Sequence, residues 1–161
     1  MIFKTSLDKT AIVITIGVTI LFAVIIAGQF AFIKNAEHST PIYTTVGLVL
    51  IYLLAFTFRP IDYLITAEEV VIRRPLKNVR IKRLDIAHIE LVDKTVMIGS
   101  VRTFGVGGLF GYYGSFANLS LGSMTWYTTR RDTAVLLKTR THKKIILTPN
   151  EPERFIAQFN S

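Results

Sequence analysis

The chain begins with two long apolar runs and then changes to short segments in which apolar and polar residues alternate. Residues 11–33 and residues 42–58 contain no charged side chain. A helix needs about 20 apolar residues to cross the hydrocarbon core of a bilayer, with a working range of about 17 to 25. The pattern therefore predicts a transmembrane helical hairpin over residues 11–58, with Tyr43 and Arg59 at the membrane interface.

Two other interpretations of these runs are a pair of buried core helices and a cleaved signal peptide. A protein of 161 residues could hardly bury two helices that are apolar on all sides. The run at 11–33 is longer than the apolar part of a signal peptide, and no clear A-x-A site follows it. We therefore expect an uncleaved anchor.

The positive charges on either side of the hairpin predict its orientation. The N-terminal tail, residues 1–10, carries two Lys, and the segment after the second run is rich in Arg and Lys. The connector 34–41 carries one Lys and one Glu. Because positive residues are retained on the cytoplasmic side, both flanks are expected in the cytoplasm.

From residue 62 onward the apolar residues follow a period of two. In "VRIKR", residues 79–83, Val79 and Ile81 alternate with basic side chains, as in a half-buried strand. Such patterns predict strands near 62–66, 70–74, 79–82, 86–92, 96–103, 124–130, 134–139 and 144–148. Short neighbouring strands with brief turns are typical of an antiparallel β-sandwich or barrel, here over residues 59–161.

The last residues return to a helical period. Phe155, Ile156 and Phe159 fall on one face of a short helix, which is expected to dock on the sheets. Thr148 and Glu151 have the spacing of a capping box, with Pro149 at the favoured first position and Asn150 as another possible cap.

The stretch "RTFGVGGLFGYYGSF", residues 102–116, mixes glycine with aromatic residues and is expected to be a loop. It is no nucleotide site, because Phe110 occupies the third glycine position of G-x-G-x-x-G and no G-K-[ST] follows. Two interpretations stay open. The glycines provide positive φ for tight bends around an aromatic mini-core, or the aromatic side chains contact lipid or a partner. The glycines are Gly107, Gly108, Gly111 and Gly114, and the candidate contact residues are Phe110, Tyr112 and Tyr113.

Most of the positive charge follows the hairpin. The net charge is +8, and 16 of the 19 Lys and Arg residues lie in residues 59–161. Basic residues near an anionic leaflet are attracted to it, although a solvated strand face would have the same composition. The candidate contact residues in this segment are Arg73, Arg74, Lys77, Arg80 and Lys82.

The sequence offers little catalytic chemistry. It has no Cys, and His38, His88 and His142 are scattered without metal-ligand spacing. Glu68 and Glu69 are adjacent, so on a strand they would point to opposite faces. No nucleophile motif and no nucleic-acid recognition motif occurs. We therefore expect no enzyme, no metal, no cofactor and no nucleic-acid partner.

Three segments carry a resemblance to a known family: "FGVGGLFGYYGSF", "LGSMTWYTTRRDTAVLLKT" and "KKIILTPNEPERFI". Over residues 60–159 the chain resembles the bacterial PH (pleckstrin-homology)-like domains, which are typically joined to membrane helices. The resemblance implies a PH-like fold with a C-terminal helix and a membrane setting, which we expect to be the bacterial inner membrane. It implies no settled ligand, so no functional residue is carried over.

Together these observations predict a membrane-anchored, non-catalytic interaction module. It would bind a protein segment or an anionic membrane surface, or self-assemble as a homo-oligomer at the inner membrane. The alternative is an accessory subunit of a membrane transport or envelope-stress complex.

Overall fold

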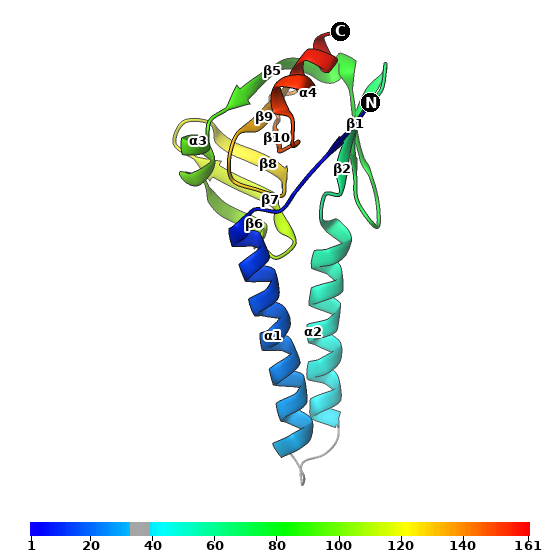
Figure 1. The fold of residues 1–161 in the computed structure, drawn as a ribbon, viewed down its shortest axis with the longest axis vertical. Coiled ribbons are helices and arrows are strands. Elements are labelled where there is room, and N and C mark those ends of the chain that lie inside the picture. The colour runs from blue at the N-terminus through cyan, green and yellow to red at the C-terminus, as the bar shows by residue number, and fades with distance from the viewer. Residues whose placement is uncertain (33–38) are drawn as a thin grey trace.

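The computed structural model describes residues 1–32 and 39–161, and it places a β-rich head at one end of a helical hairpin (Figure 1). The hairpin consists of α1 (Lys9–Phe32) and α2 (Ser39–Phe58), in agreement with the two apolar runs. The 24 residues of α1 extend about 36 Å at 1.5 Å per residue. By length and composition, Lys9–Ala31 and Pro41–Phe58 are candidate membrane spans.

Two β-sheets form the head. The first sheet is antiparallel and has the order β1-β2-β3-β4, with β1 (Ile2–Lys4), β2 (Asp62–Ile65), β3 (Glu69–Arg73) and β4 (Val79–Lys82). The second has the order β5-β9-β10-β8-β7-β6, with β5 (Ile86–Val92), β6 (Val101–Gly108), β7 (Gly111–Asn118), β8 (Gly122–Thr128), β9 (Ala134–Thr139) and β10 (Lys144–Leu147). The predicted β-sandwich with a C-terminal helix is confirmed, although β8 and β10 pair in parallel.

The second sheet lies between two apolar cores, because successive side chains along its strands point alternately into one core and into the other. Val135 and Leu137 of β9 face the first sheet and α4 (Pro152–Asn160), whereas Ala134 and Leu136 face the other side. On that other side, α3 (Lys94–Ile98) and the first turn of α1 cover the sheet. The start of the hairpin is therefore part of the head's own core.

The N-terminal residues add a strand that the sequence patterns did not suggest. Phe3 of β1 pairs with Tyr63 of β2 and is 3% exposed. Its ring lies edge-on to that of Phe155, with 5.0 Å between the ring centroids. Residues on both sides of the hairpin thus build one sheet.

The terminal helix has the predicted apolar face but a different start. Phe155 is fully buried, and Ile156 and Phe159 pack against the same core, so the docking is confirmed. The predicted capping box is wrong, because α4 begins at Pro152 after Glu151, without a side-chain cap. The hydroxyl of Thr148 instead accepts a hydrogen bond from the Thr129 amide at 3.0 Å.

The predicted strand at 96–103 is wrong in its first half, where the chain forms α3. Asp93 precedes this helix, and Met97, 1% exposed, fills the core beneath it. The hydroxyl of Ser100 donates to the carbonyl of Val96 at 2.8 Å. Packing of Met97 therefore outweighs the β propensity of "TVMI".

The predicted loop at 102–116 is also wrong, because it forms the hairpin of β6 and β7. Gly105 pairs with Gly114 across the two strands, and both have positive φ, 104° and 121°. A Cβ on either one would overlap the backbone of the opposite strand. Glycine is thus what lets these strands pair so closely.

Candidate interaction site at the junction of the helices and the head

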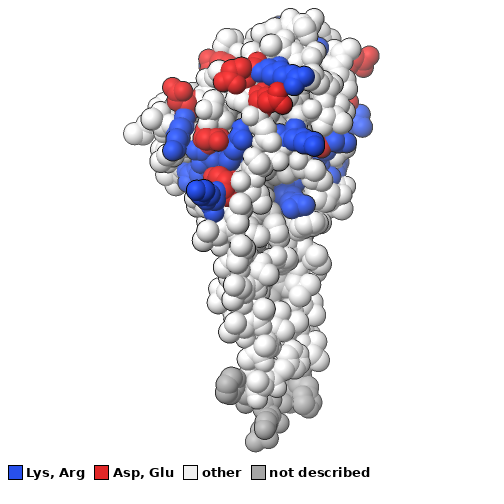
Figure 2. All heavy atoms as spheres, viewed as in Figure 1, with Lys and Arg blue, Asp and Glu red and all other residues white. Residues whose placement is uncertain are grey.

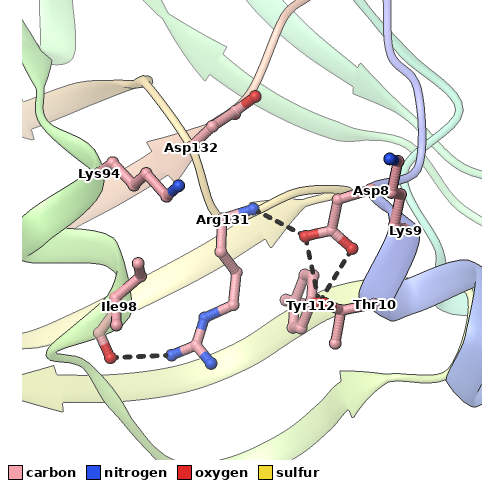
Figure 3. Close-up of a pocket in the computed structure, with 8 residues that line it drawn as sticks. All are labelled: Asp8, Lys9, Thr10, Lys94, Ile98, Tyr112, Arg131 and Asp132. Carbon is pink, nitrogen blue, oxygen red and sulfur yellow. Dashed lines mark hydrogen bonds between the residues drawn. The ribbon is translucent and has the colours of Figure 1, made fainter.

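Asp8 connects the start of α1 to the second sheet (Figure 3). Its Oδ1 accepts a hydrogen bond from the amide of Ala11 at 2.7 Å, so it caps the helix. The Tyr112 hydroxyl donates to both carboxylate oxygens, at 3.1 and 3.2 Å. The amide of Arg131 donates to Oδ2 at 3.1 Å. One carboxylate therefore joins α1, β7 and the segment after β8.

Arg131 continues this arrangement on the other side of the same pocket. Its guanidinium donates to the carbonyls of Met97, Ile98 and Ser100, at 3.1, 3.4 and 2.8 Å, and so binds the end of α3. The pocket has a volume of about 400 Å³, and burial, followed by the charge of Asp8, raises the pKa of Tyr112 to about 12. Because Asp8 and Arg131 are engaged with the protein itself, this pocket acts as a structural joint.

The turn between β6 and β7 contacts both helices of the hairpin. Phe110 has a φ of 59°, and its ring lies edge-on to those of Tyr52 and Phe56 of α2, at 5.1 and 5.4 Å. Its amide donates to the hydroxyl of Thr15 of α1 at 2.9 Å. The turn therefore holds both helices at once.

Tyr113 makes a second link to α2. Its hydroxyl donates to the carbonyl of Ala55, near the end of the helix. Burial is the main reason why the pKa of Tyr113 is raised. With Asp8 and Phe110, this contact fixes the head on the hairpin at three places.

Beside this joint lies an open apolar groove with a volume of about 720 Å³. We call it the junction groove. One side is formed by residues of the two helices: Ile14, Val18, Ile51, Leu54, Ala55 and Phe58. The other side is formed by Arg74 and by residues of β6, β7, β8 and the β6–β7 turn: Arg102, Phe104, Gly105, Val106, Gly107, Leu109, Tyr113, Gly114, Thr125 and Tyr127. Its size lies in the range of ligand pockets.

Two arginines are the charged residues of the junction groove. The Nε of Arg74 donates to the carbonyl of Lys77 at 2.7 Å, and its guanidinium lies near the rings of Phe58 and Tyr127. Arg102 lies against Gly107, where a Cβ would be 3.2 Å from Nη1. Among the described residues, no carboxylate pairs with Arg74 or Arg102.

A family model described as Bacterial PH domain matches residues 61–161. The chain belongs to the bacterial PH domain family. Searches of curated proteins and of solved structures found no match. The match covers the strands β2 to β10 together with α3 and α4, whereas β1, α1 and α2 lie before it.

Two of the basic residues that the sequence singled out are paired within the PH domain. Asp62 accepts two hydrogen bonds from Arg73, each of 2.5 Å, and these bonds raise the pKa of Arg73. Arg80 donates to Glu69 at 2.9 Å. Both pairs bridge neighbouring strands of the first sheet. They leave part of the basic segment neutralised by nearby carboxylates.

Three predicted basic residues of that segment remain: Arg74 lines the junction groove, and Lys77 and Lys82 are exposed. Lys77 lies in the turn between β3 and β4, where the amide of Leu76 donates to the carbonyl of Thr57 at 3.3 Å. This turn therefore sits beside the last turn of α2. Of the five predicted basic contact residues, the structure brings Arg74 and Lys77 to the junction with the helices.

The aromatic residues of the predicted contact surface are mostly buried by the protein itself. Phe110 packs on α2, and Tyr112, 2% exposed, belongs to the core of the PH domain. They do not form a separate mini-core. Tyr113 lines the junction groove.

The four predicted glycines differ in their backbone geometry. Gly108, Gly111 and Gly114 have positive φ, whereas Gly107 has not and instead gives room to the side chain of Arg102. Gly105, which was not among them, has positive φ and the closest backbone contact.

Sequence reasoning named Phe110, Tyr113 and Arg74 but missed two other residues of the junction, Asp8 and Arg102. Asp8 stands three residues before Ala11 and precedes an apolar helix, which is a typical N-cap signal. Arg102 gave no such signal, because its role depends on the pairing of β6 with β7. Among the described residues, no group of three or more His, Asp or Glu side chains is placed to hold a metal ion.

Proposed function

We propose that this protein is a membrane-anchored, non-catalytic interaction module of the bacterial inner membrane. The observation that carries the proposal is the exposed apolar surface of both helices. Only 6% of the α1 span and 11% of the α2 span are buried within the protein. Exposed residues such as Ile16, Ile20, Leu50 and Leu54 would face water without a bilayer, and an apolar surface of this size is unfavourable in water.

The distribution of charge agrees with this proposal. In Figure 2 the visible face of the helical stem is without Lys, Arg, Asp and Glu, whereas these residues gather on the head. Lys9 begins α1, and Arg59 follows α2 directly. Positive residues at both head-side ends of the hairpin favour a cytoplasmic position for the head.

The contacts at the junction suggest what such a module does. Asp8, Phe110 and Tyr113 tie the PH domain to both helices, so its groove and its basic turn are held at one height relative to the bilayer. A surface that is already held in place loses little conformational entropy when it binds a ligand, whereas a surface on a flexible tether would lose more. The ligands that fit are the anionic surface of the bilayer, a protein segment near it or a second copy of the chain.

Fractionation and topology reporters test the proposal. The protein should stay in the membrane pellet after alkaline carbonate washing, which removes peripheral proteins. A reporter that is active only outside the cytoplasm should be silent after Ser161 and active within the 34–41 connector. A soluble protein would contradict the anchoring, and the reverse reporter pattern would contradict the orientation.

A further inference from the structure

The junction groove combines an apolar wall with two cations. Ile51, Leu54 and Val18 form its apolar wall on the helices, and Arg74 and Arg102 are its cations. Ile51 and Phe58 are seven residues apart on α2, which is about 10 Å along the helix. The groove therefore runs from the head along the half of the hairpin that is nearer to the head.

The charges of the groove indicate an anionic occupant. A guanidinium binds phosphate oxygens through two parallel hydrogen bonds, and such bonds are stronger than those between neutral groups. Arg73 and Arg80, in contrast, are neutralised by Asp62 and Glu69. In the described part of the chain, Arg74 and Arg102 lack such a carboxylate, so their charge remains available to a ligand.

The position of the arginines along the groove indicates an amphiphile. Arg74 lies near the ring of Phe58, the last residue of α2, and is followed by the turn that touches Thr57. Ile51 and Val18 lie deeper along the helices, where the surface is apolar. A molecule with a charged head and an apolar tail fits this order.

We propose that the junction groove binds an anionic phospholipid of the bilayer. Its phosphate lies between Arg74 and Arg102, and its acyl chains lie against Ile51, Leu54 and Val18. This proposal rests on the insertion of the hairpin in a membrane, as inferred above. A partner helix would leave the two arginines without an acceptor, and a soluble anion would leave the apolar wall uncovered.

Lipid binding to the purified full-length protein tests the proposal. Delipidated protein in detergent is titrated with phosphatidylglycerol or with phosphatidylcholine, and bound lipid is counted by native mass spectrometry. We expect one phosphatidylglycerol per chain, bound at least about tenfold more tightly than phosphatidylcholine. Equal binding of both lipids would overturn the proposal, since phosphatidylcholine shares the phosphate but carries no net charge.

Three variants locate the binding. The double variant Arg74→Gln/Arg102→Gln should lose the preference for phosphatidylglycerol. The double variant Lys4→Gln/Lys143→Gln removes the same charge from exposed positions outside the groove and should keep the preference for phosphatidylglycerol. Val106→Trp, which narrows the groove and leaves both arginines in place, should weaken binding of both lipids.

The results distinguish binding in the groove from binding elsewhere on the protein. If Arg74→Gln/Arg102→Gln binds phosphatidylglycerol as tightly as the parent, or if the Lys control loses as much, the groove is not the site. Should the double Arg variant fail to fold, Arg102→Gln alone decides, because Arg102 is exposed and forms no ion pair with another described residue. A protein that resists carbonate washing but shows no lipid preference would refute the groove and leave the anchoring intact.

Discussion

The Tyr112 hydroxyl donates hydrogen bonds to both carboxylate oxygens of Asp8, at 3.1 and 3.2 Å, across 104 residues of sequence. The same carboxylate caps α1 and accepts a hydrogen bond from the backbone amide of Arg131. A helix that began without such a contact could swing relative to the sheet. This pair instead makes the first turn of α1 a continuation of the PH domain's core.

Replacement of Asp8 by Ala should destabilise the protein by about 2 to 4 kcal/mol. The change removes an N-cap, worth about 1 kcal/mol, and leaves Tyr112 without its acceptor. Unfolding by denaturant in a mild detergent measures the loss. The control is Asp93→Ala, which removes an exposed carboxylate before α3 that makes no capping bond. Equal effects of the two changes would show that the Asp8 contacts contribute nothing.

The pKa of Tyr112 predicts how stability changes at high pH. Burial and Asp8 raise this pKa to about 12, above the ordinary value of 10.0. The unfolded chain therefore loses the phenol proton first, so stability is full below about pH 10 and falls as the pH rises toward 12. Tyr112→Phe lacks this proton. We expect it to be less stable than the parent at pH 8 and to lose less stability between pH 8 and pH 11.

The buried phenol of Tyr63 titrates in the same range. Burial raises its pKa to about 12, so the Tyr112→Phe variant should retain part of the alkaline loss. Denaturant unfolding at both pH values measures the difference. An identical loss in parent and variant would contradict the coupling of Tyr112 ionisation to folding.

The sequence predicted those parts of the fold that depend on local periodicity. The two apolar runs, the strands such as 79–82 and the helix face around Phe155 follow from side-chain spacing alone. The hairpin of β6 and β7 did not, because glycine is unfavourable in isolated strands and becomes favourable where two backbones approach closely. Gly105 and Gly114 support β pairing only in each other's presence.

The residues of the candidate site divide in the same way, into those that local sequence indicates and those that depend on tertiary structure. Composition pointed to the basic segment after the hairpin, and Arg74 and Lys77 do lie at the junction. Arg73 belongs to the same run of charge, yet it pairs with Asp62 eleven residues earlier. Cross-strand register decides which of these cations is free, and register is not visible in charge counts. Arg102 became a candidate through tertiary structure.

Gly114→Ala should destabilise the protein by about 2 to 5 kcal/mol. The added Cβ would lie 2.8 Å from the Cα of Gly105 and would overlap the carbonyl of Phe104, in addition to the strain of a φ of 121°. The control is Gly122→Ala, which has a φ of 68° but no atom within 4 Å of the new Cβ. It should cost about 1 to 2 kcal/mol from backbone strain alone.

Comparison of the two glycine variants by denaturant unfolding separates strain from close approach. Similar losses would mean that β6 and β7 do not approach as closely as the structure has them. A larger loss for Gly114→Ala would support the close pairing of Gly105 with Gly114, two residues that line the junction groove.

The contact between Phe3 and Phe155 predicts that the two ends of the chain stabilise each other. Phe155→Ala should cost about 3 to 5 kcal/mol, because its fully buried ring packs against Phe3 of β1 and Tyr63 of β2. Phe3→Ala should also destabilise the protein, since it removes the ring on which Phe155 packs. Edge-to-face aromatic pairs contribute about 0.5 to 1.5 kcal/mol beyond their burial. The double variant should therefore lose less than the sum of the single losses by about that amount.

A double-mutant cycle of unfolding free energies in detergent measures this coupling. Leu119→Ala combined with Phe155→Ala is the control pair, because Leu119 is fully exposed in the β7–β8 turn and its effect should be additive. Additive losses for Phe3 and Phe155 would mean that β1 does not dock beside α4. Coupled losses would mean that residues before the hairpin complete the PH domain after it, so that removal of Ile2–Lys4 weakens the domain although the family match begins at residue 61.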